Sequence, residues 1–284
     1  LGENMFSNGG ILGASSSGPS FIDAGIYADD SDGRGHYAVS YYINKRATIS
    51  YWYRNDYANS SYGTQFWGNY HGSQDHTGGW LGADGYVYHF VKYNNSQYHN
   101  GKSSSACSAA QLTHNKWHHF CCIMSTSTVK VYIDGTEMLS LTANDYTDMF
   151  SGYWGLHSTW NSNISTLSGS PSWTAKSPTY IAQFAVVTGS SPGTISEFIN
   201  SDGTPIDFQD TDGSGTDLDT QRASPENSSE ANGFWLFGAN GTTSSKTHNS
   251  ASDGSSNANW NGGDSNYALS TDTSVFPVTG INEG

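Results

Sequence analysis

Aromatic side chains gather with Asn, Asp and His in two glycine-containing segments, QFWGNYHGSQDHTGGW (65–80) and GYWGLHSTWNSN (152–163), which we expect to be loops. An exposed Trp or Tyr ring can pack on the C–H face of a sugar, and the polar groups beside it can hydrogen-bond the sugar hydroxyls. The segments therefore predict a glycan-binding surface. Its expected residues are Trp67, Tyr70, His71, Trp80, Tyr153, Trp154, His157 and Trp160. Because Trp is mostly buried in folded proteins, a core role for each Trp is the alternative.

Two Asp-rich loops, DAGIYADDSDGRG (23–35) and DFQDTDGSGTDLD (207–219), suggest a calcium site. Calcium binds roughly six to eight oxygens, and alternating Asp in a glycine-hinged loop can supply several of them. The candidate ligands are Asp29, Asp30, Asp32, Asp210, Asp212, Asp217 and Asp219. Neither loop is an EF-hand, because the bidentate Glu at its end is missing. Since Asp-Gly pairs are common in turns, solvated turns are the alternative.

The segment KWHHFCCIM (116–124) brings two histidines and two cysteines together. His118 and His119 are neighbours on an expected strand, so they point to opposite faces and cannot chelate one metal ion. We expect a structural role for both, with one hydrogen-bonded inside and the other near the surface. Cys107, Cys121 and Cys122 form no CxxC pair, and we expect buried, reduced thiols.

The elements that position these residues read almost entirely as β-strands. Alternating stretches rich in Tyr, Val, Ile and Thr are separated by turn residues, as in an antiparallel sandwich. The expected strands are 36–43, 47–54, 85–93, 116–124, 128–134, 179–187 and 233–238. One short helix is expected from Thr194 to Asn200.

The segment TVKVYIDGTEMLSL (128–141) predicts a β-hairpin. A period of two places Val129, Val131 and Ile133 on one face of the first strand, with Lys130 and Tyr132 on the other. Asp134-Gly135 then forms the turn.

The segment KWHHFCCIMSTSTVKVYIDGTEMLSL (116–141) resembles the central signature of laminin-G-like domains in the concanavalin A-like superfamily, and the earlier run ATISYWYRND resembles their early strand. Downstream, TYIAQFAVVTG and FINSDGTPIDFQDTDGSGTD resemble the closing part of laminin-G-like domains of bacteriophage virion proteins. The resemblance implies an all-β, concanavalin A-like jelly-roll sandwich of two antiparallel sheets. Such a fold hosts lectins, enzymes and structural modules alike, so its site must decide the function.

The catalytic patterns of enzymes with this fold are missing. Retaining glycosidases that have this fold resemble one another in carrying the pattern E-x-D-x-E on one strand. None of the Glu residues of this chain lies in that pattern. Glu226 and Glu230 share a segment that we expect to be a loop. The closest approach to a lyase constellation is Tyr88, His89 and Tyr93, without the supporting Arg and Gln. We therefore expect no catalytic residues.

Three parts are expected along the chain. Residues 1–20 form an N-terminal arm, 21–238 a laminin-G-like jelly-roll domain, and 239–284 a polar C-terminal arm. The last is nearly free of aliphatic residues up to about 266 and is expected to dock back on the domain or on a neighbouring subunit.

Composition excludes several partners. The chain has 284 residues, with 11 Lys plus Arg against 25 Asp plus Glu, so it lacks the basic stripe that nucleic-acid binding needs. No apolar run approaches the ~20 residues of a membrane span, and the first residues lack the regions of a signal peptide, so we expect a soluble chain without membrane insertion. Aromatic residues, 14 % of the chain, are expected to build the core.

Together these features predict a non-enzymatic virion structural protein of a bacteriophage, a capsid decoration, fibre or tail appendage that binds glycans during host or surface attachment. Its expected partners are other virion proteins, its own copies in a homo-oligomer, and host or environmental glycans, at the virion surface. The alternative is a secreted carbohydrate-active enzyme, a polysaccharide lyase or glycoside hydrolase, or its carbohydrate-binding module.

Overall fold

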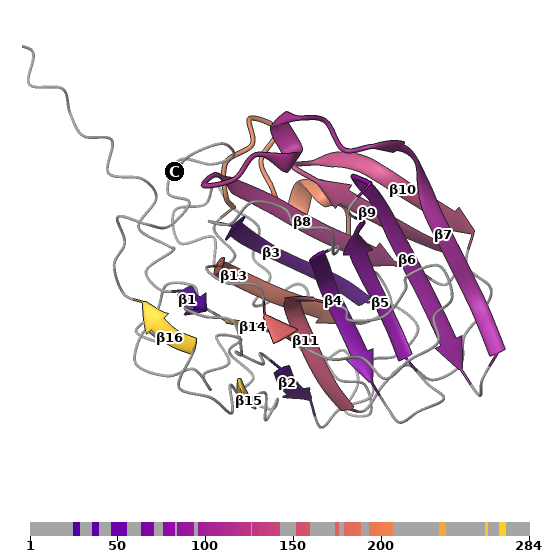
Figure 1. Ribbon diagram of the computed structural model, residues 1–284, viewed down its shortest axis with the longest axis horizontal. Helices are drawn as coiled ribbons and strands as arrows, with labels where there is room; N and C mark the ends of the chain where they lie inside the picture. Colours follow the sequence, from indigo (N-terminus) through magenta and orange to yellow (C-terminus); the bar gives the residue numbers. More distant parts are fainter. Residues whose placement is uncertain are drawn as a thin grey trace, which may run out of the picture.

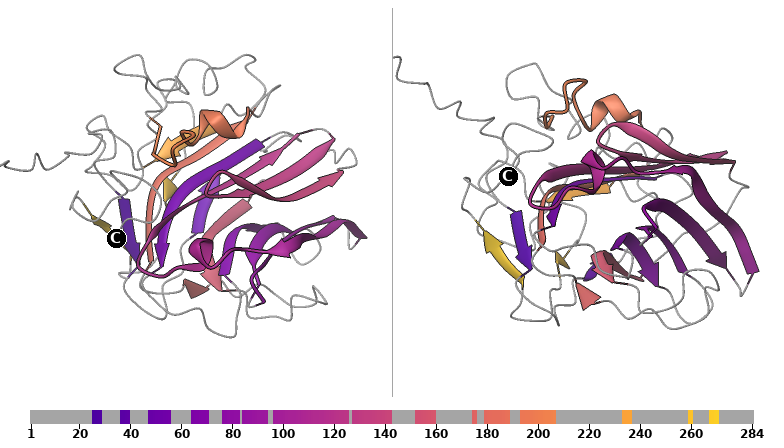
Figure 2. Two further views of the ribbon diagram at one scale, coloured as in Figure 1. Left: turned by 90° about the horizontal axis from the view of Figure 1, so that it is seen from above. Right: turned by 45° about the horizontal axis from the view of Figure 1, so that its top comes forward.

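Two antiparallel sheets pack face to face in the computed structural model (Figures 1 and 2). The structure describes residues 25–28, 36–39, 47–55, 64–70, 76–82, 84–93, 96–125, 127–142, 152–159, 174–175, 179–188, 193–206, 233–236, 259–260 and 267–270. Within these residues the only helical elements are two short 3₁₀ turns, η1 (Ala110–Leu112) and η2 (Ile195–Glu197). No helix in this described part is long and apolar enough to cross a membrane.

The first sheet, sheet A, contains the predicted hairpin. Its strands follow the order β10 (Thr136–Thr142), β9 (Thr128–Ile133), β8 (Trp117–Met124), β3 (Ala47–Asn55), β13 (Thr179–Thr188), β1 (Gly25–Ala28) and β16 (Tyr267–Ser270), with β14 (Gly233–Leu236) paired to β13. The turn between β9 and β10 has positive φ at both Asp134 (53°) and Gly135 (72°). This is the backbone of a two-residue hairpin turn, which Asp-Gly favours, so the hairpin prediction is confirmed.

The second sheet, sheet B, contains both aromatic segments. Its strands follow the order β15 (Asn259–Trp260), β2 (His36–Val39), β11 (Gly152–Thr159), β4 (Thr64–Tyr70), β5 (His76–Leu81), β6 (Tyr86–Tyr93) and β7 (Ser96–Ala106), with β12 (Thr174–Ala175) paired to β11. The expectation that 65–80 and 152–163 are loops is therefore wrong for most of their length. Their glycines and polar residues break the usual alternation, but neighbouring strands hold them in the sheet.

Aromatic rings fill the space between the sheets. Tyr53 of β3 and Phe120 of β8 both contact Phe66 of β4, with ring centroids 5.6 Å and 4.5 Å apart. The Tyr51 hydroxyl donates to the Phe66 carbonyl oxygen at 2.5 Å, which satisfies its polar end inside the core. The expected aromatic core is thus present between the sheets.

The face of sheet A that points away from sheet B is covered by residues 193–206 (orange in Figure 2). Phe198 packs with Cys121, and Ile199 packs with Trp52 and Trp117. The central strand β8 is therefore buried on both faces, with all eight of its residues buried.

Each of the seven predicted strand ranges contains a strand, and Val129, Val131 and Ile133 share the buried inner face as predicted. The predicted helix at 194–200 is shorter, a single 3₁₀ turn that begins after Thr194. Glu197 Oε1 accepts a hydrogen bond from the Thr194 amide at 3.3 Å, a capping contact at its start.

Two short strands late in the chain join the sheets. Tyr267–Ser270 (β16) pairs with β1, and Asn259–Trp260 (β15) pairs with β2. These stretches lie in the predicted arm 239–284, while the proposed boundaries at 20 and 238 remain predictions.

Candidate functional site

The two aromatic segments predicted to bind glycans lie side by side in sheet B, on β11, β4 and β5 (Figure 1). Backbone pairing places Trp67 opposite Leu156 and Tyr70 opposite Tyr153. Residues about 85 positions apart in the sequence thus share neighbouring strands. Trp154 and His157 also lie on β11, whereas His71 and Trp160 fall outside the described residues.

Trp80 of β5 is the one candidate glycan-binding residue whose side chain is described, and it is buried, with 3 % of its surface exposed. Its ring stacks on Tyr88 of β6, with centroids 5.9 Å apart and planes 9° from parallel. Direct sugar contact by the Trp80 face is therefore not supported. Instead, Trp80 packs against Tyr88, which belongs to a more exposed group of side chains.

That group, the Lys102 cluster, consists of Asp84, Tyr86, Tyr88 and Lys102. Asp84 Oδ2 accepts hydrogen bonds from Lys102 Nζ at 2.9 Å and from the Tyr88 hydroxyl at 2.7 Å. The ammonium also lies over the Tyr86 ring, 3.8 Å from its centroid, and 5.3 Å from that of Tyr88. Because the Asp84 and Lys102 side chains are each nearly half exposed, one face of the cluster is open to solvent.

Two backbone features build the Lys102 cluster. Gly82, in the turn between β5 and β6, has no room for a Cβ, which would clash with Asp84 Oδ1 and lie 2.7 Å from Tyr88 Cε2. The second feature is a bulge in β7. Tyr86 of β6 pairs with Ala106 and Tyr88 pairs with Lys102, so a step of two residues in β6 faces a step of four residues in β7. Bulges re-aim side chains, and this one sets Lys102 directly opposite Tyr88.

The bulge is held from inside by Ser103, whose side chain is buried. Its hydroxyl accepts a hydrogen bond from the Val87 amide at 3.0 Å and donates one to the Ser105 carbonyl oxygen at 2.7 Å. The side chain therefore takes the place of a backbone partner in the ladder.

In the Lys102 cluster, the Asp84 carboxyl and the Lys102 amine are both charged at neutral pH. Partial burial acts to raise the pKa of the Asp84 carboxyl, but hydrogen bonds from Lys102, Tyr88 and the Tyr86 amide together hold it below its ordinary value. Hydrogen bonds with Asp84 and Tyr88 raise the pKa of the Lys102 ammonium. The cluster thus presents a carboxylate acceptor beside an ammonium donor, with no net charge.

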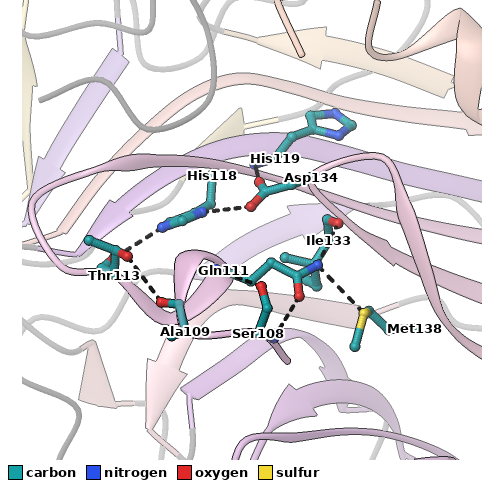
Figure 3. A network of polar contacts seen from close by, with 9 residues as sticks. All are labelled: Ser108, Ala109, Gln111, Thr113, His118, His119, Ile133, Asp134 and Met138. Carbon is teal, nitrogen blue, oxygen red and sulfur yellow. Dashed lines mark hydrogen bonds and ion pairs between the residues drawn. The ribbon is translucent and has the colours of Figure 1, made fainter. Parts of the chain in front are cut away.

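His118 and His119 point to opposite faces of β8, as predicted, but both are buried, so the expectation that one lies near the surface is wrong. His118 Nδ1 lies 2.8 Å from Asp134 Oδ2, and His118 Nε2 lies 3.0 Å from the Thr113 carbonyl oxygen (Figure 3). Asp134 Oδ1 accepts from the His119 amide at 2.9 Å. This network fastens the turn after β9 to β8, which is a structural role.

His119 lies on the outer face of sheet A, where its ring contacts Trp52 with centroids 5.1 Å apart. Its Nε2 is 2.8 Å from Ser50 Oγ. Burial lowers the pKa of His119 to about 3, because no charged partner offsets the cost of a buried imidazolium. His119 is therefore neutral at physiological pH and is buried because residues 193–206 cover this face.

All three cysteines are free and buried, as predicted. Burial raises the pKa of Cys107 to about 11, with the Asp134 charge adding to it, and raises that of Cys121 well above its ordinary value. A thiol that stays protonated is a poor nucleophile and metal ligand, so the geometry gives these cysteines packing roles.

Two further sets of predicted residues, the calcium ligands and the lyase constellation, remain. All seven candidate calcium ligands lie outside the described residues, and within those residues no group of three or more metal-ligating side chains occurs. Calcium therefore stays a prediction. Of the weak lyase constellation, His89 is buried while Tyr88 is partly exposed on the opposite face of β6, so the strand separates the two side chains.

Sequence reasoning missed Asp84, Tyr86 and Lys102. The alternation of Tyr86 and Tyr88 along β6, next to an Asp-Gly turn, is a signal that they share a face. Lys102 could not be found this way, because its place opposite Tyr88 depends on the bulge.

Residues 35–163 match a laminin G-type family model described as Concanavalin A-like lectin/glucanases superfamily. With the two antiparallel sheets, this match confirms the predicted fold class, a concanavalin A-like jelly-roll sandwich. The matched stretch contains the aromatic strands and the Lys102 cluster. No curated protein matches the chain.

Solved structures with a similar arrangement have low sequence identity. A putative carbohydrate binding protein from Bacteroides ovatus is 12 % identical, with a TM-score of 0.48, over 89 % of this chain and 60 % of that one. A heptameric SAP-like pentraxin from Limulus polyphemus is 13 % identical, with a TM-score of 0.38, over 58 % of this chain and 76 % of that one. Domains LG4-5 of the mouse laminin alpha1 chain are 14 % identical, with a TM-score of 0.42, over 58 % of this chain and 41 % of that one. In the first and the third, this chain spans less than two thirds of the other chain's length.

Proposed function

We propose that this protein is a non-enzymatic glycan-binding module, with sheet B as its binding sheet. The observation that carries the proposal is the pairing of β11 with β4 and of β4 with β5. It brings two segments rich in Trp, Tyr, His and Asn onto neighbouring strands of one sheet. Aromatic rings interleaved with amide and imidazole groups have the chemistry that sugar recognition uses.

The family match supports the same direction, because the matched superfamily includes lectins by its own description. The neutral, buried His119 and the protonated, buried thiols give these residues no evident nucleophilic task. We propose that the chain binds carbohydrate without cleaving or otherwise modifying it.

The setting that we propose is the surface of a bacteriophage particle, as a decoration, fibre or tail appendage that attaches to host or environmental glycans. The support is the resemblance of 179–189 and 198–217 to the closing part of virion laminin-G-like domains. In this setting the chain would be extracellular and would contact its own copies and other virion proteins.

The binding function is tested by applying the purified full chain to an array of plant, algal and bacterial glycans. Each glycan that binds is then incubated with the chain and assayed for new reducing ends and for unsaturated products. We expect binding without either product. Product formation would contradict the proposal and favour a glycoside hydrolase or a polysaccharide lyase, and an array without hits would favour a purely structural protein.

The virion setting is tested separately by mass spectrometry of purified particles from a lysate of the organism that encodes the chain. We expect peptides of the chain at a fixed ratio to the capsid protein. Their absence from particles, together with their presence in the culture medium, would contradict the virion setting and leave the glycan-binding proposal standing.

A further inference from the structure

The Lys102 cluster lies in the same sheet as the aromatic strands, on β6, on β7 and in the turn between β5 and β6. We propose that it is a sugar subsite that binds a neutral sugar unit through two adjacent hydroxyl groups. This inference rests on the proposed glycan-binding function and names the ligand class for it.

The first step is a comparison with a second, similar group on sheet A. Lys130 Nζ and the Tyr132 hydroxyl both contact Glu137 Oε2, at 2.8 Å and 3.2 Å. These residues belong to β9 and β10 of the hairpin, where Tyr132 pairs directly with Glu137. This Lys130 cluster is a cross-strand contact beside a register shift between Glu137 and Leu139 of β10.

The Lys102 cluster depends on more than a shift of register, because three separate adjustments build it. Gly82 leaves space for Asp84 and Tyr88, the β7 bulge brings Lys102 opposite Tyr88, and Ser103 holds that bulge from inside. An ion pair that is nearly half exposed adds little to folding, because water screens it. Stability therefore gives no reason for these adjustments, whereas a fixed arrangement of exposed donors and acceptors does.

The second step is the chemistry that the Lys102 cluster presents. The carboxylate of Asp84 only accepts hydrogen bonds and the ammonium of Lys102 only donates them. A pair of adjacent sugar hydroxyls, each of which can donate and accept, complements such a pair. The Tyr86 and Tyr88 rings lie next to the ammonium and are partly exposed, so the parts of them that face solvent offer apolar surface to sugar C–H groups.

The third step is the choice between neutral and acidic sugars. Lys102 is already paired with Asp84 at 2.9 Å, so a sugar carboxylate or sulfate placed against the ammonium would come close to the Asp84 charge. Like charges at such a distance repel, and the Lys102 cluster has no second cation to offset this. The arrangement therefore favours uncharged sugars.

The test is isothermal titration calorimetry of the full chain with two sets of probes. Neutral probes are cellohexaose, mannohexaose and a galactan oligosaccharide, and acidic probes are oligogalacturonate and a sulfated carrageenan oligosaccharide. The variants are Asp84→Asn and Lys102→Met, and the matched controls are Glu137→Gln and Lys130→Met in the Lys130 cluster. Thermal unfolding followed by circular dichroism verifies that each variant is folded.

We expect the unchanged chain to bind at least one neutral probe, and Asp84→Asn and Lys102→Met each to weaken that binding about tenfold or more. The two controls should bind as the unchanged chain does. Binding that survives both substitutions would overturn the subsite while leaving the proposed function intact. Binding of acidic probes alone would overturn the ligand class, and binding of no probe, together with an array without hits, would overturn the proposed function as well.

Discussion

Asp134, at the tip of the β9–β10 turn, lies 2.8 Å from the ring of His118 on β8. The Thr113 carbonyl oxygen lies 3.0 Å from the other ring nitrogen, so polar groups hold the His118 ring from both sides. Asp134 also accepts from the His119 amide, and its own amide donates to the His119 carbonyl oxygen. Asp134 thus joins two parts of the laminin-G-like segment 116–141, W-H-H (117–119) and Y-x-D-G (132–135), into a single structural unit.

Replacement of Asp134 should destabilise the fold strongly. Asp134→Ala leaves the buried His118 without its partner, and we expect a loss of about 3 kcal/mol in the free energy of unfolding. Asp134→Asn should lose less, because Asn keeps an acceptor and tolerates positive φ. Urea denaturation measures both, and Glu137→Gln, at an exposed carboxylate on the same hairpin, should change stability by less than about 1 kcal/mol. Equal losses at positions 134 and 137 would contradict the structural role of Asp134.

Acid should weaken the fold through His119. Its pKa is about 3 in the folded chain and about 6.5 when unfolded, so the unfolded state binds more protons between these values. Stability is therefore fully present above about pH 6.5 and is lost as the pH falls, by about 2 kcal/mol between pH 7 and pH 5. In urea denaturation at the two pH values, His119→Gln should remove most of this difference. An unchanged difference in this variant would show that other groups cause it.

The thiols should be unreactive in the folded chain. All three cysteines are buried, burial raises the pKa of Cys107 and Cys121, and only a thiolate attacks a disulfide reagent. We expect no reaction with Ellman's reagent at pH 8 in native buffer and three equivalents in guanidinium chloride. Rapid reaction of a thiol in native buffer would mean that the core around it opens readily.

The β7 bulge should depend on Ser103. Without its hydroxyl, the Val87 amide loses its hydrogen-bond acceptor, so Ser103→Ala should cost about 1–2 kcal/mol of unfolding free energy. Ser104→Ala, at the exposed neighbouring position, should be close to neutral. Urea denaturation of the two variants gives the comparison, and equal stability would mean that Ser103 does not hold the bulge.

The parts of the fold that could be predicted are those determined by local pattern. Val129, Val131 and Ile133 alternate with polar residues and end at Asp134-Gly135, so both strand and turn are readable from a few neighbours. By contrast, Gly68, Gly78 and Gly79 made the aromatic segments look like loops, and only their pairing with each other and with β6 makes them strands. The burial of His119 was equally hidden, because residues 193–206, which cover its face of sheet A, come much later in the chain.

In the candidate site, too, the residue types could be predicted from the sequence, whereas the contacts between distant residues could not. Aromatic and polar residue types mark the strands of sheet B that we propose to bind glycans, because their chemistry is visible in the sequence. The approach of Lys102 to Asp84 depends on the register of β6 against β7 and on a bulge, and neither can be read from residue spacing. Trp80 looked like a sugar-stacking residue, yet it packs under Tyr88.

Hydrogen–deuterium exchange of the full chain, with and without the neutral oligosaccharide that binds best on the array, tests the glycan-binding account most directly. We predict slower exchange on binding in peptides that cover β4, β5 and β11 and in those that cover residues 84–102, with no change in β8, β9 and β10. Protection confined to β8–β10, or binding with no protection anywhere in sheet B, would contradict the account.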